Sequence, residues 1–324
     1  MTFQRRDILR LAAASAAGAS FHAQAQKYPS RPVTMVVPYP AGGSTDIVAR
    51  LVALRLGDTL GQSVIVENRG GAAGNIGASY VAKGPADGYR ILLATQPVVA
   101  INPFLYPDSA VDAQKDLVPV TDAVNAVVAI AVHPSLGANN VRELIDVAKR
   151  TPGGLNYGTS GAGSGQHIAG AMLASKAGIM LTHVPYRGGG PMSNDLVAGH
   201  IKVGIGILSV LKPLAEQGKV KIVAIGERTR FAAMPQLPTI SETIPGFEMT
   251  TWFGFFAAAG VPKEVVQTLA REIGAAMNTA EVKAKLADAM MVVRANGPES
   301  LARQLKGDQE MFGRLIREHR ISVV

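Results

Sequence analysis

Short apolar runs alternate with longer amphipathic segments along most of the chain. Val33–Val37 is rich in β-branched residues and is closed by Pro38, which predicts a buried strand. Residues 46–60 carry apolar side chains at a spacing of four, from Val48 to Leu60, which predicts a helix. The same alternation predicts further strands at 64–66, 90–95, 127–132, 155–158, 201–208 and 220–226, and helices near 76–83, 141–150, 166–177, 209–217, 263–278, 281–290 and 299–319.

This order of elements predicts two α/β lobes. Strands that alternate with helices indicate βαβ units and a mostly parallel sheet, but about ten strands are too many for one sheet of ordinary size. We expect the chain to cross between lobes near residues 122–128 and 246–254. The predicted division is 26–126 for the first part of lobe 1, 127–250 for lobe 2, and 251–324 for the return to lobe 1. Two such lobes can face each other across a ligand cleft.

The first 25 residues have the pattern of an export signal. Arg5, Arg6 and Arg10 precede an apolar stretch, and Ala23-Gln24-Ala25 supplies small residues where a signal peptidase cleaves. We therefore expect cleavage near Ala25 and a periplasmic mature protein. The Arg5-Arg6 pair is typical of a twin-arginine signal, with an ordinary Sec signal as the alternative.

Composition excludes several classes of function. Aromatic residues make up only 5% of the 324 residues, and no block of five like charges occurs, so a nucleic-acid surface is not expected. The net charge of +8 becomes about +6 once residues 1–25 are removed, a mild excess that favours anionic solutes. Cysteine is absent and no two histidines of the mature chain are four residues apart. We therefore expect no disulfide, no metal site and no cofactor.

Three loops between a predicted strand and a predicted helix combine glycines with hydroxyl or amide side chains. They are residues 38–46, 70–75 and 157–167. Glycine lets the backbone approach a ligand closely, and unpaired N–H groups at the start of a helix form an anion site. No dinucleotide or P-loop fingerprint occurs in these loops. One such loop is compatible with a simple capped turn, but three together predict a polar cleft lined by backbone donors.

Motifs along nearly the whole mature chain are similar to those of the Bug-type receptors, the solute-binding components of tripartite tricarboxylate transporters. The first is Tyr28–Val33, which runs into Val36–Gly43 and Asp46. The other matching positions are Val66–Ala72, Gly74–Gly77, Pro85–Tyr89, Ser160, Gly161, Gly163, Ser164, His167, Val184–Gly189, Pro235, Leu237–Thr239, Glu242, Pro245–Phe247 and Trp252.

The resemblance implies a two-lobe, periplasmic-binding-protein-like (type II) fold that closes around a small carboxylated solute. It implies a monomeric receptor that is not an enzyme, with a membrane permease or a sensor kinase as a possible further partner. In this family the carboxylate is held mainly by backbone amides, hydroxyls and ordered water. Carried over by motif position, the ligand-binding residues are Tyr39, Ala41, Gly42, Gly43, Ser44, Thr45, Asp46, Asn75, Ile76, Gln96, Thr159, Ser160, Gly163 and Ser164.

The chain departs from the family pattern at one position that bears on the ligand. Family members often carry an acidic residue in a segment like L-M-F-D, where this chain has Val203–Leu208. If that acid holds an amino group, its loss favours a di- or tricarboxylate, a hydroxy acid or an aromatic acid over an amino acid.

Three residues, Ser164, Arg187 and Trp252, have alternative functional interpretations. Ser164 lies three residues before His167, so an exported α/β hydrolase or transferase is the alternative function, although the G-x-S-x-G pattern is absent. Arg187 is interpreted as a surface-turn residue, with a substrate clamp as the alternative. Trp252 is interpreted as part of a buried strand between the lobes, with ligand stacking as the alternative.

Overall fold

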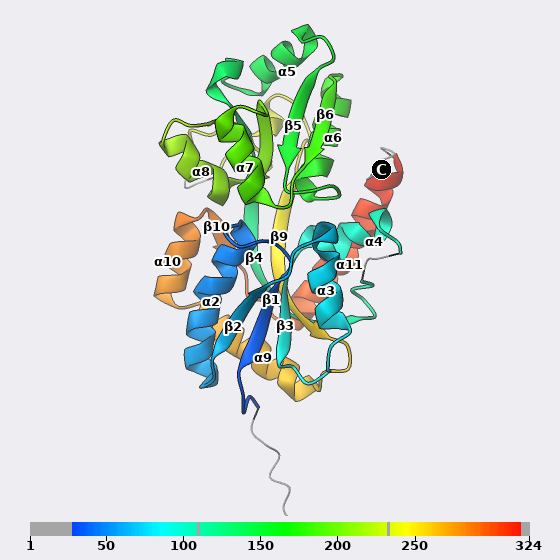
Figure 1. The fold of residues 1–324 in the computed structure, drawn as a ribbon, viewed down its shortest axis with the longest axis vertical. Coiled ribbons are helices and arrows are strands. Elements are labelled where there is room, and N and C mark those ends of the chain that lie inside the picture. The colour runs from blue at the N-terminus through cyan, green and yellow to red at the C-terminus, as the bar shows by residue number, and fades with distance from the viewer. Residues whose placement is uncertain (1–27, 109–110, 232–233, 319–324) are drawn as a thin grey trace, which may run out of the picture.

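The computed structural model describes residues 28–108, 111–231 and 234–318. The predicted signal peptide lies outside the described residues. The chain forms two α/β lobes that lie one above the other along the long axis (Figure 1). This arrangement confirms the two-lobe fold that the sequence predicted.

Lobe 1 is built around β1 (Val33–Val37), which pairs in parallel with β2 (Val64–Asn68) and β3 (Arg90–Thr95). β9 (Thr250–Ala258) continues this sheet antiparallel to β3, and the short β10 (Met291–Val293) pairs with β4 (Leu117–Val132). The helices that surround the sheet are α2 (Ser44–Leu60), α3 (Asn75–Ala82), α4 (Asn102–Leu105), α9 (Lys263–Met277), α10 (Ala280–Asp288) and α11 (Pro298–Glu318), with the short η1 (Ala72–Gly74) and the π-helical η2 (Pro97–Ile101) (Figure 1).

Lobe 2 has a smaller sheet of the same design. β5 (Leu155–Thr159) pairs in parallel with β6 (Leu181–Pro185) and β7 (Val203–Ile207), and β8 (Lys221–Ile225) pairs with β4. Its helices are α5 (Val141–Arg150), α6 (Gly165–Ala177), α7 (Gly189–Ala198) and α8 (Leu208–Glu216), with the short η3 (Pro134–Leu136) and η4 (Ile240–Glu242).

β4 passes from one lobe into the other. From Leu117 to Val127 it pairs with β9 of lobe 1, and from Val128 to Val132 it pairs with β7 of lobe 2. β9 begins at Thr250, opposite Val127, and leads the chain back. We propose lobe boundaries near residues 126 and 250 on the strength of these changes of strand partner.

The sheet is mixed, which corrects the expectation of a mostly parallel one. β9 is antiparallel to β3, and β4 is antiparallel to β7, β8 and β9. The reason is that β4 and β9, the two strands that join the lobes, run antiparallel to the strands of the βαβ units beside them. The sequence did not predict the first half of β4, where Pro119, Asp122 and Asn125 interrupt the apolar pattern. Asp122 is nevertheless buried, because its carboxylate accepts hydrogen bonds from the backbone and side-chain N–H groups of Asn296 at 2.5 and 2.8 Å.

The hydrophobic core is centred on strands β1, β3 and β9. Phe253, Phe255 and Phe256 of β9 are buried, together with the apolar residues of β1 and β3. Trp252 is also buried, and its indole Nε1 donates to Asp308 of α11 at 2.5 Å. This corresponds to the buried-strand interpretation of Trp252. Among the described residues, no helix is long and apolar enough to cross a membrane.

Candidate ligand-binding site

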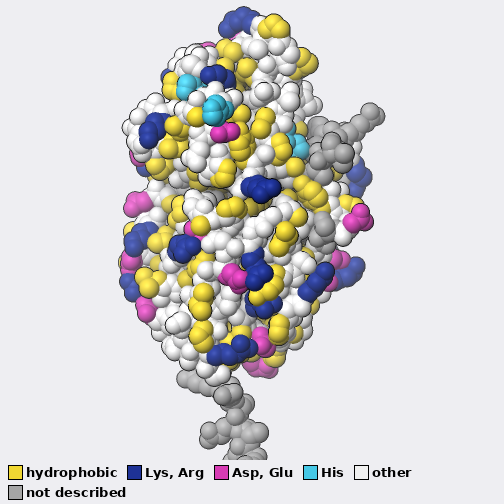
Figure 2. Space-filling model, viewed as in Figure 1, with side chains coloured by type: hydrophobic (Ala, Val, Ile, Leu, Met, Phe, Trp, Pro, Cys, Tyr) yellow, Lys and Arg dark blue, Asp and Glu magenta, His cyan; other side chains and the backbone are white. Residues whose placement is uncertain are grey.

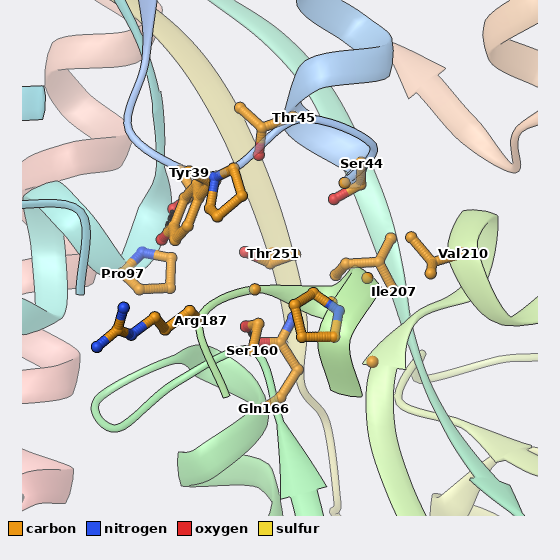
Figure 3. Close-up of a pocket in the computed structure, with 18 of the residues that line it drawn as sticks. Tyr39, Ser44, Thr45, Pro97, Ser160, Gln166, Arg187, Ile207, Val210 and Thr251 are labelled. Carbon is orange, nitrogen blue, oxygen red and sulfur yellow. Dashed lines mark hydrogen bonds between the residues drawn. The ribbon is translucent and has the colours of Figure 1, made fainter. Parts of the chain in front are cut away.

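A cavity with about 640 Å³ of empty space, its mouth included, lies between the two lobes. In Figure 3, Tyr39, Ser44 and Thr45 of lobe 1 face Ser160, Gln166 and Arg187 of lobe 2 across it. On the face of the molecule shown in Figure 2, the band between the lobes carries few charged side chains. The lining residues are Tyr39, Pro40, Ala41, Gly43, Ser44, Thr45, Thr95, Pro97, Ser160, Gln166, Arg187, Gly188, Gly189, Gly190, Pro191, Gly206, Ile207, Val210, Thr251 and Phe253.

The lobe 1 wall is the loop that joins β1 to α2. Gly42 has φ of +85°, a left-handed conformation that lets the chain turn sharply into the helix. The N-cap residue of α2 is Gly43, which has no side chain to bond the first-turn N–H groups. The helix dipole adds partial positive charge at the same place, beside the hydroxyls of Ser44 and Thr45. This wall therefore offers donors to an anion.

Asp46 supports this loop from behind. It is only 5% exposed, and its Oδ2 accepts hydrogen bonds from the Gly42 N–H and from Arg50 Nε, both at 3.0 Å. Its Oδ1 accepts from Asn68 Nδ2, which also donates to the Tyr39 carbonyl. Burial disfavours the charged form, but these hydrogen bonds outweigh it and hold the pKa of Asp46 below its usual value. The carboxylate is thus committed to shaping the loop.

The lobe 2 wall comes from two strand-to-helix loops. Ser160 Oγ donates to Gln166 Oε1 at 3.1 Å, and both residues line the cavity. The second loop leads into α7, whose N-cap is Gly188 with φ of +118° and no side chain to cap the first turn. A second glycine-capped helix start therefore lies on the opposite side of the cavity from α2.

A buried histidine and a half-buried one lie beneath the loop that carries Ser160. The rings of His167 and His183 are stacked, with centroids 3.9 Å apart and planes inclined by 11°. His167 Nδ1 accepts from the Gly163 N–H at 3.2 Å, and His183 Nε2 lies 2.7 Å from Thr159 Oγ1. Burial lowers the pKa of both rings, and a charge on His167 would lower that of His183 further, to about 3. The pair is therefore neutral at neutral pH.

This histidine pair predicts a loss of stability in acid. Below about pH 6.5 an unfolded histidine binds a proton that folded His183 does not bind until about pH 3, so the unfolded state gains as pH falls through that window. The slope for one proton is up to about 1.4 kcal/mol per pH unit, reduced here because the ring is partly solvated. His183→Gln, which can keep the contact to Thr159, is expected to flatten the slope of the unfolding free energy, measured in urea from pH 4.5 to 7.5.

His200→Gln, which removes an imidazole whose side chain is 72% exposed, is the matched control for this measurement. A slope in His183→Gln that is as steep as in the wild type would contradict the prediction.

The floor of the cavity is formed by β3, η2 and β9. Tyr39 Oη lies 2.9 Å from Thr95 Oγ1, and burial raises the pKa of Tyr39 to about 12, so its hydroxyl stays neutral. Gln96, between the lining residues Thr95 and Pro97, is buried and donates to Asp308 Oδ2 at 2.6 Å. The same oxygen accepts from Trp252, between the lining residues Thr251 and Phe253. One carboxylate of α11 thus connects both segments of the floor.

The structure brings some of the predicted ligand-binding residues to the cavity and places others behind it. Six of the fourteen line it: Tyr39, Ala41, Gly43, Ser44, Thr45 and Ser160. Ile76 is 52% exposed and lines a separate groove on lobe 1, with Asn75. The rest lie in or below the loops without lining the cavity: Gly42, Asp46, Gln96, Thr159, Gly163 and Ser164. Ligand contact by any of the fourteen stays a prediction.

Several lining residues were not predicted. The sequence analysis assigned neither β6 nor α7, so it did not identify the loop Arg187–Pro191 as a third strand-to-helix loop at the cleft. Its signal was present, since three consecutive glycines follow Arg187. The other unpredicted lining residues are Pro40, Thr95, Pro97, Gln166, Gly206, Ile207, Val210, Thr251 and Phe253.

The charge of the cavity favours an anion. Among the described residues that line it, none is Asp or Glu, and Arg187 is the single cation. Two glycine-capped helix starts add partial positive charge. No group of three or more His, Cys, Asp or Glu side chains in the described part of the chain could hold a metal ion.

Two α/β lobes joined by long strands, with a cavity between them that carries hydroxyl, amide and guanidinium groups beside apolar side chains, define a two-lobe solute-binding protein. The family model described as "Tripartite tricarboxylate transporter family receptor" matches residues 48–321, and the chain belongs to this family of solute-binding receptors. The family to which the sequence motifs pointed is thereby confirmed. Protein BugT of Bordetella pertussis is 33% identical over 268 residues, which cover 82% of each chain.

Solved structures of similar proteins agree with this fold. The structure of R. palustris Rpa4515 with adipate has a TM-score of 0.88 and 34% identity, and covers 91% of this chain and 99% of that one. MatC (Rpa3494) from Rhodopseudomonas palustris with bound malate has a TM-score of 0.84 and 28% identity, and covers 89% of this chain and all of the other.

Proposed function

We propose that this protein captures a small carboxylate in the cavity between its lobes, for uptake or sensing. The observation that carries the proposal is a cavity at which two glycine-capped helices begin, one from each lobe, and whose lining has no Asp or Glu within the described part of the chain. Backbone N–H groups and the hydroxyls of Ser44, Thr45 and Ser160 are the donors for the carboxylate. The adipate and malate bound by the two similar proteins support this class of ligand.

The ligand class is narrowed by the apolar side of the cavity. Ile207 lines the cavity at the end of β7, in the segment where an acid was expected, and Val210 of α8 follows it. An ammonium group bound here would lose its hydration without gaining a carboxylate partner. The proposed ligand is therefore a di- or tricarboxylate, a hydroxy acid or an aromatic acid, and not an amino acid.

The alternative of a hydrolase or transferase has less support from the geometry. Ser164 is the N-cap of α6, and its Oγ accepts a hydrogen bond from the backbone N–H of His167 at 3.1 Å. His167 Nδ1 accepts from the Gly163 N–H, and Ser164 Oγ donates to Thr159 Oγ1 at 3.4 Å, so the Ser164 hydroxyl is not paired with that ring nitrogen as a nucleophile is with its base. We propose a receptor without catalysis, which returns its ligand unchanged.

Export of the protein is also part of the proposal. Members of this family are periplasmic receptors, and the first 25 residues have the charged, apolar and small-residue regions of a signal peptide. We propose that mature protein in the periplasm delivers its ligand to a membrane permease or a sensor kinase.

A thermal-shift screen of residues 26–324 tests the proposal. Because a ligand that binds only the folded state adds about 2.7 kcal/mol of stability at a hundred times its Kd, small carboxylates are expected to raise the unfolding midpoint. Amino acids, sugars and nucleotides are expected to leave it unchanged, and NMR should recover the bound carboxylate unaltered. A shift with sugars or nucleotides alone would contradict the proposed function.

A further inference from the structure

Arg187 is the only charged side chain among the described residues that line the cavity. The other lining groups are hydroxyls, one amide, glycines and apolar side chains. A single cation at an otherwise uncharged lining distinguishes ligands that differ in charge.

The backbone on both sides of Arg187 is fixed, whereas its side chain is free. The Tyr186 N–H donates to the Thr159 carbonyl at 3.1 Å, and the Gly188 N–H donates to the Ser160 carbonyl at 3.0 Å. The exposed Arg187 guanidinium makes no hydrogen bond or ion pair with any residue that the structure describes. Its five N–H donors are thus available to a ligand, from a position that the backbone holds in place.

The position of Arg187 gives the cavity two chemically different ends. In Figure 3 the Arg187 side chain lies beside Pro97 at one end, while Ile207 and Val210 lie at the other. The Arg187 loop also meets lobe 1, since a Cβ added to Gly188 would lie 3.7 Å from Cδ of Pro40. The loop that carries Arg187 therefore lies at the contact between the lobes.

We propose that Arg187 is a specificity-determining residue that selects ligands with a second carboxylate. One carboxylate is held by the α2 wall and Ser160, as the proposed function requires, and the second pairs with the guanidinium at the Pro97 end. A planar guanidinium matches a carboxylate with two parallel hydrogen bonds, which a neutral group of the same shape cannot form.

Matched ligand pairs test this inference. Titration calorimetry would compare dicarboxylates from succinate to suberate with their monoamides, which keep the shape but lose one charge. We expect wild-type protein to prefer at least one dicarboxylate over its monoamide by about 10-fold or more. In Arg187→Gln the ratio is expected to fall to about 1 to 3 with the monoamide affinity unchanged, and Arg187→Lys is expected to restore part of it.

The control variant is Arg142→Gln on α5, which removes an exposed arginine of the same lobe far from the cavity (Figure 1). It is expected to keep the wild-type ratio. A ratio unchanged in Arg187→Gln, an equal loss for both ligands, or a wild-type ratio near 1 would each overturn the inference and leave the proposed function standing. If the wild type bound no carboxylate of any kind, both would be overturned.

Discussion

Gly43→Val is expected to lower carboxylate affinity by at least about 100-fold, or about 2.7 kcal/mol. Gly43 lines the cavity at the first turn of α2, where an added Cβ would meet only the Pro40 carbonyl, 3.9 Å away. The isopropyl group would occupy the space through which an anion reaches the N–H groups of the helix start. Calorimetry with a ligand identified in the thermal-shift screen measures the change.

The same substitution is expected to leave the ligand-free fold nearly intact. Gly43 has φ of −84° and ψ of 171°, an extended conformation that valine adopts readily. Loss of a glycine N-cap costs about 1 kcal/mol or less. Gly43→Ala should give an intermediate loss of affinity, and Gly307→Val on α11, outside the cavity, should give none. Wild-type affinity in Gly43→Val would mean that the carboxylate binds elsewhere.

Asp46→Ala is expected to affect both stability and binding. Removal of the carboxylate leaves the Gly42 N–H without its acceptor, and Asn68 Nδ2 loses one of its two acceptors. The free energy of unfolding should therefore fall by about 1 to 3 kcal/mol. The loop before α2 would then relax, and ligand affinity should fall by about 10-fold or more, since anion donors act only when held in place. Urea unfolding and calorimetry measure the two effects separately.

Asp46→Asn keeps one acceptor oxygen and should be milder in both measurements. The control is Asp58→Ala on the same helix, whose side chain is 61% exposed and pairs with Arg55, so little change is expected. Full loss of stability with wild-type affinity would show that Asp46 supports the fold but not the geometry of the site.

The local sequence pattern was sufficient to predict a cavity-lining loop that directly joins one strand to the next helix. The β1–α2 loop was predicted from its glycines and hydroxyls, and Gly43, Ser44 and Thr45 do line the cavity. The loop at 70–75 has the same composition but a different role. A Cβ added to Gly70 would lie 3.1 Å from Cδ of Pro40, so a glycine there serves close packing against the first loop. Asn75 is buried and accepts from Asn102 Nδ2 at 2.7 Å.

The loop at 157–167 in lobe 2 also shows that a glycine-rich composition does not by itself reveal what the loop contacts. Gly163 lies against lobe 1, where its added Cβ would be 3.1 Å from Leu105 and 3.2 Å from Tyr106. Tyr106 Oη donates to the Ala162 carbonyl at 3.0 Å, so part of this loop contacts the other lobe. Whether a glycine approaches a ligand, a helix or another lobe depends on partners that are distant in sequence.

The two-lobe α/β fold and the glycine-rich loops between strands and helices could be predicted from the sequence, because periodicity and composition are local properties of the chain. The caps of the helices were not predicted, since Gly43 and not a hydroxyl or carboxylate side chain is the N-cap of α2, and the helix that begins after Gly188 was not assigned. The tertiary structure alone decided which residues meet at the cavity. Thr251 and Phe253 lie more than 150 residues beyond Thr95 but share its floor, because β9 pairs with β3. Arg187 lies in a loop that the sequence analysis interpreted as a surface turn, and its cation reaches the cavity only because lobe 2 faces lobe 1.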